Sequence, residues 1–282
     1  MNEYTSHSHM TNPGQFRHLY DGLPADLDGL HHVINNIFIH MWKLRKSNIG
    51  TERKSDYAIR NTEAILKRIT AYDDAPLTRQ RPRHKQFVGD CRHAAVLLCS
   101  MLRQQGIPAR VRHGFCQYIS SDTNNYSYHV VTEFWDGQRW VLEDADIIRH
   151  DIPREEFIFG AQAWQKYRAG EINLERFYLT EDLFGEAWIF PLPMLRDLAS
   201  LANYEVTSSD SWGLISPYHV MSDTERAMLD DAASILSQDG DTFNTVQDIY
   251  QKYPLVRVSR PLFAWEWAVE DMIEFDISAE LK

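Results

Sequence analysis

Cysteine is scarce in this sequence, which contains Cys91, Cys99 and Cys116. A small, odd number of cysteines does not form the disulfide framework that stabilises small secreted domains. The first ten residues, MNEYTSHSHM, also lack the basic and apolar stretches of a signal peptide. We therefore expect a cytoplasmic protein whose thiols stay reduced.

Long apolar runs and an excess of positive charge are absent too. The densest apolar stretch, AAVLLCSML, is far shorter than the roughly 20 residues of a membrane-spanning helix. The formal net charge is −11, whereas nucleic-acid-binding proteins present a basic face. The sequence therefore predicts neither a membrane nor a nucleic acid as a partner, and it does not indicate an oligomeric state.

The 282 residues contain no internal repeat and no low-complexity linker, and three regions differ in their sequence pattern. Residues 1–80 are expected to be helical after a disordered tip. Residues 81–150 are expected to form a core of mixed helix and strand, which the motifs below identify as the candidate catalytic core. Residues 151–282 are expected to be mostly helical and to pack on the core, so that all three regions could form one domain.

Helical spacing in the N-terminal region predicts two helices. Apolar residues from Leu30 to Met41 recur at helical intervals, with Asp28 available near the start. A second helix follows, with Ser55 as its candidate N-cap.

The stretch VGDCRHAAVLL, residues 88–98, places Cys91 at the start of a predicted helix. This helix extends to Gln105 and is ended by Gly106. Free backbone N–H groups and the positive dipole end favour a thiolate in a first helical turn. Cys91 is therefore the candidate nucleophile, with a buried structural cysteine as the alternative, whereas Cys99 and Cys116 are predicted to be structural.

The segment YHVVTEFW-DG-QRWVLEDAD predicts a β-hairpin. If the Asp-Gly pair forms a two-residue turn, His129 lies directly opposite Asp144, and opposed Cβ atoms are about 4.5–5.5 Å apart. Glu143 then points to the other face, while Asp146 shares the face of His129 two positions further along. The sequence predicts Asp144 as the partner of His129, with Asp146 as the reserve.

A cysteine nucleophile, a histidine that moves protons and an aspartate that orients the histidine suffice for acyl transfer. Cys91, His129 and Asp144 are therefore the predicted catalytic residues. Gln86, in the loop before Cys91, is a candidate donor of a hydrogen bond to an oxyanion, although a polar loop residue is the simpler alternative.

Two stretches, GDCRHAAVLLCSMLRQQGIPARVRHGF and YHVVTEFWDGQRWVLEDAD, together resemble the core of the transglutaminase-like superfamily. The shared features are a Gly-x-Cys helix start, Gly-Ile-Pro-Ala-Arg before a strand, a histidine on the next strand and Trp-x-x-x-Asp after it. By this resemblance the family's Cys-His-Asp triad also falls on Cys91, His129 and Asp144. Val130 departs from the family, which often has an aromatic residue after the histidine.

The resemblance covers about 60 residues and implies an α+β fold. Its core is papain- and transglutaminase-like: the nucleophile helix packs on an antiparallel β-sheet, here with helical N- and C-terminal extensions. The flanking regions are similar to bacterial members of the superfamily whose substrate is not assigned.

The resemblance also implies a cysteine-dependent enzyme. We expect peptidase-like or amidase-like hydrolysis of an amide through an acyl-enzyme on Cys91. The alternatives are a transglutaminase-type or biosynthetic amide synthase that transfers the acyl group to an amine, and an inactive scaffold or binding protein. The expected acyl donor is a peptide, a protein, or a small-molecule amide or thioester.

Three histidines of the N-terminal region, His31, His32 and His40, raise the question of a metal. Their spacing matches no compact ligand set, and the sequence contains no Cys-x-x-Cys motif. The sequence therefore predicts solvated or locally bonded histidines, with no cofactor and no required metal.

Overall fold

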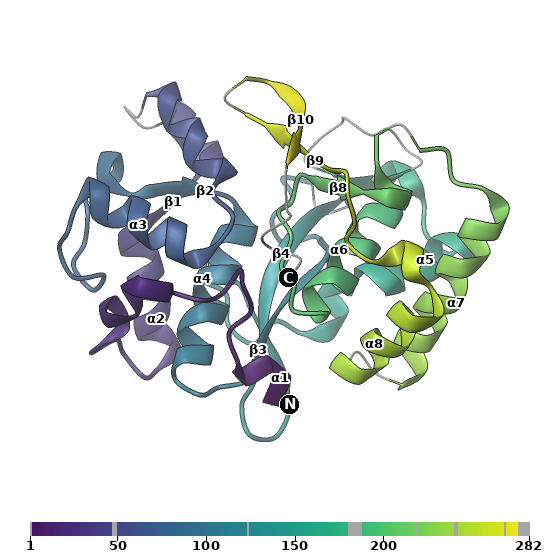
Figure 1. The fold of residues 1–282 in the computed structure, drawn as a ribbon, viewed down its shortest axis with the longest axis horizontal. Coiled ribbons are helices and arrows are strands. Elements are labelled where there is room, and N and C mark those ends of the chain that lie inside the picture. The colour runs from purple at the N-terminus through teal and green to yellow at the C-terminus, as the bar shows by residue number, and fades with distance from the viewer. Residues whose placement is uncertain are drawn as a thin grey trace.

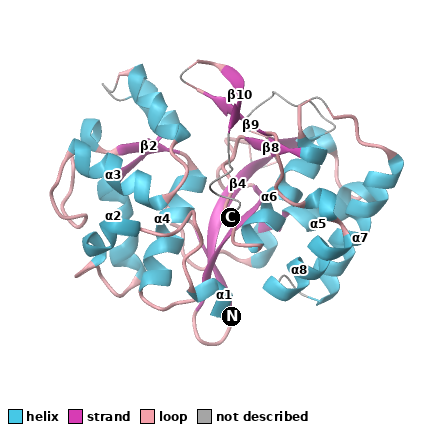
Figure 2. Cartoon of the chain, viewed as in Figure 1, coloured by secondary structure: helices cyan, strands magenta, loops and turns pink. Residues whose placement is uncertain are grey.

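The computed structural model describes residues 2–46, 50–122, 124–179, 188–217, 219–239, 242–267 and 269–275. Two groups of helices flank a central sheet, the N-terminal group on the left of Figure 1 and the C-terminal group on the right. Figure 2 shows the same mixture of helices and strands. The predicted α+β class is confirmed. None of the described helices combines the length and the apolar character needed to cross a membrane.

The central sheet carries the predicted antiparallel core. Its strand order is β5-β4-β3-β6, and a short strand, β7, pairs in parallel with the beginning of β4. The strands are β3 (Ala109–Cys116), β4 (Tyr126–Trp135), β5 (Trp140–Glu143), β6 (Phe157–Phe159) and β7 (Phe177–Tyr178).

The helix that begins at Cys91 is α4 (Cys91–Gln104), and it packs on β3 and β4. Its predicted end is confirmed to within one residue. Gly106 has a φ of +78°, and the N–H of Ile107 donates to the carbonyl of Leu102 at 3.0 Å. A glycine at this left-handed position satisfies the last carbonyls of a helix without steric strain.

The N-terminal helices begin at other residues than the sequence indicates: the first begins slightly earlier and the second later. Helix α2 (Leu27–Ile37) is capped by Asp26, which accepts from the N–H of Gly29 at 2.8 Å, while Asp28 lies in the first turn. Helix α3 (Thr62–Tyr72) is capped by Asn61. The predicted cap at Ser55 is wrong, since Thr51–Ala58 forms a separate 3₁₀ helix.

The predicted continuation of the first helix to Met41 is also wrong. The chain becomes strand β1 (Phe38–His40), which pairs in parallel with β2 (Phe87–Gly89) and places His40 beside Gly89. The pairing is close: a Cβ at Gly89 would lie 2.8 Å from Cγ of His93 and 2.9 Å from Cε2 of Phe38. A short aromatic and β-branched run therefore follows its strand preference once a partner strand is present.

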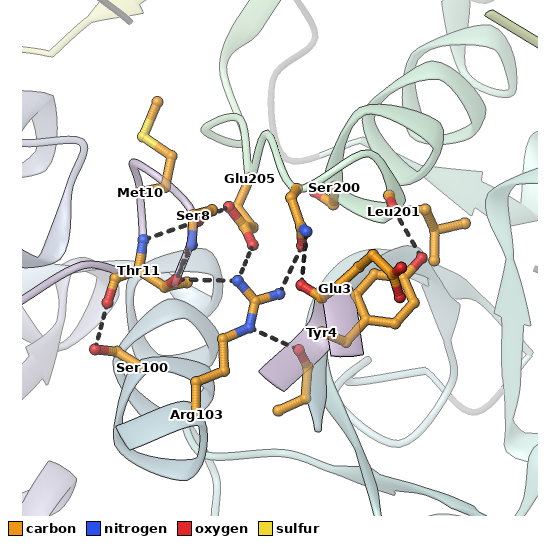
Figure 3. Close-up of polar contacts among 12 residues, drawn as sticks. Glu3, Tyr4, Ser8, Met10, Thr11, Ser100, Arg103, Ser200, Leu201 and Glu205 are labelled. Carbon is orange, nitrogen blue, oxygen red and sulfur yellow. Dashed lines mark hydrogen bonds and ion pairs between the residues drawn. The ribbon is translucent and has the colours of Figure 1, made fainter. Parts of the chain in front are cut away.

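The expected disorder of the N-terminal tip is wrong as well, because this segment is packed. It includes α1 (Asn2–Thr5), whose buried Tyr4 donates to the carbonyl of Leu201 at 2.8 Å. Arg103 of α4 donates to Oγ1 of Thr11 at 3.0 Å and pairs with Glu205 at 3.1 Å (Figure 3). The first residues therefore connect α4 to the chain beyond Leu201.

The C-terminal region contains helices α5 (Gly160–Arg168), α6 (Pro191–Leu201), α7 (Asp223–Asp239) and α8 (Phe243–Lys252). It also contains an antiparallel sheet that the sequence did not indicate, with the order β10-β9-β8. These strands are β8 (Asp210–Trp212), β9 (Leu262–Glu266) and β10 (Asp271–Phe275). Helix α6 packs on β3, and one cluster of buried apolar side chains extends from Tyr4 through α4 to Leu262. The three sequence regions thus share a core.

Candidate active site

A pocket of about 390 Å³ lies where β1, the first turn of α4 and the beginning of β4 meet. Cys91 and His129 both line it, and so does Asp146. Its apolar walls include aromatic and aliphatic side chains, namely Trp42, Tyr57, Ile119, Tyr128, Ile147, Leu179, Leu192 and Trp267.

His129 is held from behind by Asp144. The imidazole donates from Nε2 to Oδ2 of Asp144 at 2.6 Å, and both side chains are buried. Tyr118 donates to the same oxygen at 3.2 Å, while Oδ1 accepts the backbone N–H groups of Asp146 at 3.0 Å and Ile147 at 3.3 Å. Although burial opposes its charge, the pKa of Asp144 is lowered, chiefly by His129 and these donors. The carboxylate is therefore a fixed negative charge.

Cys91 is the first residue of α4, and it lines the pocket together with His129. Because Nε2 of His129 is engaged, Nδ1 is the nitrogen left for the thiol. Burial raises the pKa of Cys91 to about 11, against the charge of His129 and its hydrogen bond, which lower this pKa. Burial also opposes a charge on His129, yet Asp144 and the Cys91 thiolate raise the imidazole pKa well above 6.5. The thiolate therefore depends on a charged imidazole beside it.

A position at the start of α4 is not sufficient to make Cys91 a thiolate. Burial is the largest influence on its pKa and raises it, and the N-cap carboxylate of Asp90 raises it further. Asp90 stays ionised: burial opposes its charge, but His93 and other donors lower its pKa. A negative charge thus stands next to the nucleophile.

The turn that joins β4 to β5 differs from the predicted one. Trp135 pairs with Trp140, so the loop contains four residues rather than two. Extrapolated from this register, residue 146 rather than residue 144 would lie opposite His129. The ladder ends at Glu143, however, and the backbone of Asp144 instead exchanges two 3.0 Å hydrogen bonds with Arg149. A register shift of two preserves the face of every side chain, which is why Asp144 still reaches His129.

Asp146, the predicted reserve, faces a different histidine. Its Oδ2 lies 3.5 Å from Nε2 of His40, whereas Asp144 is the carboxylate that contacts His129. Burial raises the pKa of Asp146. Asp146 is therefore a group of the pocket wall and does not orient His129.

Gln86 does not occupy the predicted position for oxyanion binding. Its amide nitrogen donates to the carbonyls of Asn35 at 2.7 Å and Asn36 at 3.2 Å, near the end of α2. Gln86 is also not among the residues that line the pocket around Cys91. This geometry contradicts the oxyanion role and gives Gln86 a structural one.

His40 is a pocket residue that the sequence did not indicate as part of this site. The backbone N–H of Trp42 donates to its Nδ1 at 3.2 Å, which places the ring proton of the neutral form on Nε2. Burial, the largest influence, lowers the pKa of His40. The neutral side chain therefore carries its N–H on Nε2, the nitrogen that lies 3.5 Å from Oδ2 of Asp146 at the pocket wall. The short apolar run before His40 could have suggested a strand in place of the last helical turn.

Arg196 of α6 adds a cation to the lining of the pocket. Its Nε donates to the carbonyl of Asp210 at 2.9 Å. Its Nη2 is buried and has no hydrogen-bond partner among the residues that the structure describes. An unpaired buried donor beside a pocket is suited to an anionic group of a ligand.

Comparisons with known proteins agree with the family resemblance. Residues 46–145 match the model of the transglutaminase-like superfamily, and this range contains Cys91, His129 and Asp144. No curated protein gives a significant match to the chain. A solved structure, described as "a putative cysteine protease" from Cytophaga hutchinsonii, is 16% identical with a TM-score of 0.34. That alignment covers 56% of this chain and 45% of the other, so this chain matches less than half of its length. Over residues 46–145, this chain is therefore similar to the transglutaminase-like superfamily.

Proposed function

We propose that this protein is a cysteine-dependent acyl-transfer enzyme that hydrolyses an amide bond. The observation that carries the proposal is the position of His129. One ring nitrogen donates to the ionised Asp144, and the ring lines the same pocket as Cys91 and lowers the pKa of its thiol. This arrangement supports an activated nucleophile.

The proposed reaction has two halves. In the first, Sγ of Cys91 bonds to the amide carbon while His129 takes the thiol proton and then gives it to the leaving amine, so that the C–N bond breaks and a thioester remains. In the second, His129 takes a proton from water, which attacks the thioester; the C–S bond breaks, the acid leaves, and the proton returns to Cys91. Asp144 stabilises the imidazolium in both halves.

The oxyanion of each tetrahedral intermediate needs donors next to Cys91. The first turn of α4 offers backbone N–H groups, since the first N–H groups of a helix have no partner within it. His40 lies beside Gly89, two residues before the nucleophile, and presents the N–H of Nε2. We assign His40 the role of side-chain donor that sequence reasoning had given to Gln86.

The pocket also favours a class of acyl donor. Its walls are mainly apolar, and the free Nη2 of Arg196 is suited to a carboxylate. An amide substrate with an apolar group and a nearby carboxylate, such as a peptide with a free C-terminus or an acidic side chain, fits both features.

An acyl-enzyme trapping experiment tests the proposal. The full chain is incubated with a library of peptides and small amides, quenched in acid and examined by mass spectrometry, with Cys91→Ala as the control. We expect a substrate-derived mass on Cys91, loss of that mass with time as the acid appears, and neither in the control. Appearance of an amide product after addition of a primary amine would instead make the protein an acyltransferase. If no adduct forms and no amide or thioester is turned over, the proposal is overturned and the interpretation as an inactive scaffold remains.

A further inference from the structure

A second group of titratable side chains lies outside the pocket of Cys91. It joins His31 of α2, Glu143 at the end of β5 and His150 in the loop that follows. Oε2 of Glu143 lies 2.9 Å from Nε2 of His31 and 3.0 Å from Nδ1 of His150. Each residue offers one ligand atom, and these atoms all lie within 4.8 Å of one another. His31 and Glu143 are buried, while the side chain of His150 is 40% exposed.

His150 lies between two carboxylates. Its Nδ1 faces Glu143, and its Nε2 lies 3.2 Å from Oδ1 of Asp28. A cation bound to the lone pair of Nδ1 would leave the N–H on Nε2 to donate to Asp28. A metal-bound histidine in proteins commonly makes this carboxylate contact with its other nitrogen.

His31 can supply the second nitrogen ligand, because its Nε2 lies 2.9 Å from the Glu143 oxygen that His150 also faces. Binding of an ion through the lone pair of Nε2 places the ring proton on Nδ1, which is buried without a hydrogen-bond partner within the described parts of the chain. This unpaired N–H subtracts from the affinity of the site.

We propose that His31, Glu143 and His150 form a binding site for a divalent transition-metal ion, with Zn²⁺ as the best match. Two imidazole nitrogens and one carboxylate oxygen are a ligand set that zinc accepts. Ligand atoms around tetrahedral zinc are roughly 3.3 Å apart, as follows from bonds of about 2.0–2.1 Å. The separations of 2.9 and 3.0 Å are close to that spacing, so a small outward adjustment would admit the ion.

The surroundings provide access and a position for a fourth ligand. A surface pocket of about 400 Å³ is lined by Asp28, Glu143 and His150, so water can complete the coordination. Arg139 also lines this pocket, but it pairs with Asp151 at 2.5 Å. Its positive charge is thus largely neutralised.

The location suggests a structural consequence. Glu143 immediately precedes Asp144, and its other oxygen accepts the N–H of Asp151 at 3.0 Å. The ion would fasten α2 to both ends of the 144–151 turn, which carries the orienting carboxylate of the candidate triad. Metal binding itself does not require the proposed catalysis, so the two proposals can fail separately.

Metal titration of the full chain tests the site. After removal of metals with a chelator, Zn²⁺ is titrated by calorimetry, with Mg²⁺ as a comparison, and thermal unfolding is followed in parallel. Cys91→Ala is included because a thiol and an imidazole could also bind zinc in the other pocket. We expect one equivalent of Zn²⁺, no binding of Mg²⁺ and a raised Tm, all retained in Cys91→Ala.

Three further variants separate ligands from neighbours. His150→Ala, at a partly exposed position, should weaken zinc binding by more than about 100-fold, and Asp28→Asn by about 10–100-fold as for an outer-sphere partner. His32→Ala is the matched control, because this exposed histidine of the same helix should leave binding unchanged. Co²⁺ should give tetrahedral d–d absorption without a thiolate charge-transfer band. Undiminished zinc binding by His150→Ala, or loss of all binding in Cys91→Ala, would overturn the proposal; so would the absence of zinc binding by the folded wild-type chain.

Discussion

His129 and Asp144 form a 2.6 Å hydrogen bond although no rung of the β4–β5 ladder joins them. The contact exists because the chain leaves the ladder after Glu143 and turns, so that two backbone N–H groups and Tyr118 hold the carboxylate against the ring. The orientation of His129 therefore depends on the turn of residues 144–149 as much as on the sheet.

Removal of the charge on Asp144 should nearly abolish turnover. Asp144→Asn keeps the size of the side chain but no longer stabilises the imidazolium, so we expect a decrease in kcat on the order of 10³-fold. The measurement is hydrolysis of an acyl donor identified by trapping. Asp146→Asn is the matched control, since Asp146 does not contact His129; a decrease of similar size in both variants would contradict the assigned roles.

The reactivity of Cys91 should increase with pH. Because burial raises its pKa to about 11, the alkylation rate with iodoacetamide should rise between pH 7 and pH 10 without reaching a plateau. Cys91 should be labelled before Cys99, which is fully buried with a pKa raised to about 12, and before the buried Cys116.

His129→Gln removes the charge that lowers the pKa of Cys91, so it should slow the alkylation at every pH in this range. Peptide mapping by mass spectrometry gives the site-specific rates. A plateau below pH 8 in the wild-type protein would show that the thiolate is already formed and that the assigned direction of the pKa shift is wrong.

The stability that His129 contributes should decrease as pH rises. The pKa of His129 in the folded protein lies well above 6.5, so the imidazole binds its proton more tightly in the folded than in the unfolded chain. The resulting contribution to the free energy of unfolding is complete below about pH 6.5. It decreases by about 1.4 kcal/mol per pH unit as the pH rises toward the pKa of the folded state. Urea unfolding of wild type and His129→Gln from pH 5.5 upward gives this difference directly. A difference in free energy of unfolding that grows with pH would contradict the prediction.

His40 should act on the transition state more than on substrate binding. His40→Phe retains an aromatic ring but no donor, and loss of one oxyanion donor costs about 10²–10³-fold in kcat. KM should change little, since the hydrogen bond strengthens as charge develops on the oxygen. Gln86→Leu provides the comparison, because its amide faces α2 and its effect should appear in stability instead. Equal kcat values for His40→Phe and the wild type would remove His40 from the mechanism.

Arg103 should anchor the N-terminal segment. Arg103→Met leaves the buried carboxylate of Glu205 without its ion pair, and breaking such a pair costs about 3–5 kcal/mol in free energy of unfolding. Added Glu205→Met should restore part of this loss, because it removes the unpaired charge. Limited proteolysis should cut the first 12 residues faster in the single variant than in the wild type. Additive losses in the double variant would show that the two residues do not stabilise the fold as a pair.

Local features of the sequence determined a large part of the core. The Cys91 helix, its end at Gly106 and the strands on either side of the Asp-Gly turn follow from apolar periodicity and from backbone preferences that act within a few residues. The alternation of side chains along a strand also placed Asp144 on the face of His129, and this survived a register shift of two because parity did not change.

Contacts between distant segments decided the features that short-range sequence patterns do not predict. Pairing with β2 turned the expected end of a helix into β1 and brought His40 into the pocket that Cys91 lines, while Gln86 donates to carbonyls near the end of α2. Burial raises the pKa of Cys91 and His129 lowers it, and both influences come from segments that are distant in the sequence. His31 meets Glu143 and His150 across more than a hundred positions, so no spacing along the chain indicates that they share an ion. Desolvation and long-range contact depend on which distant segments exclude water together, and only the folded chain fixes these.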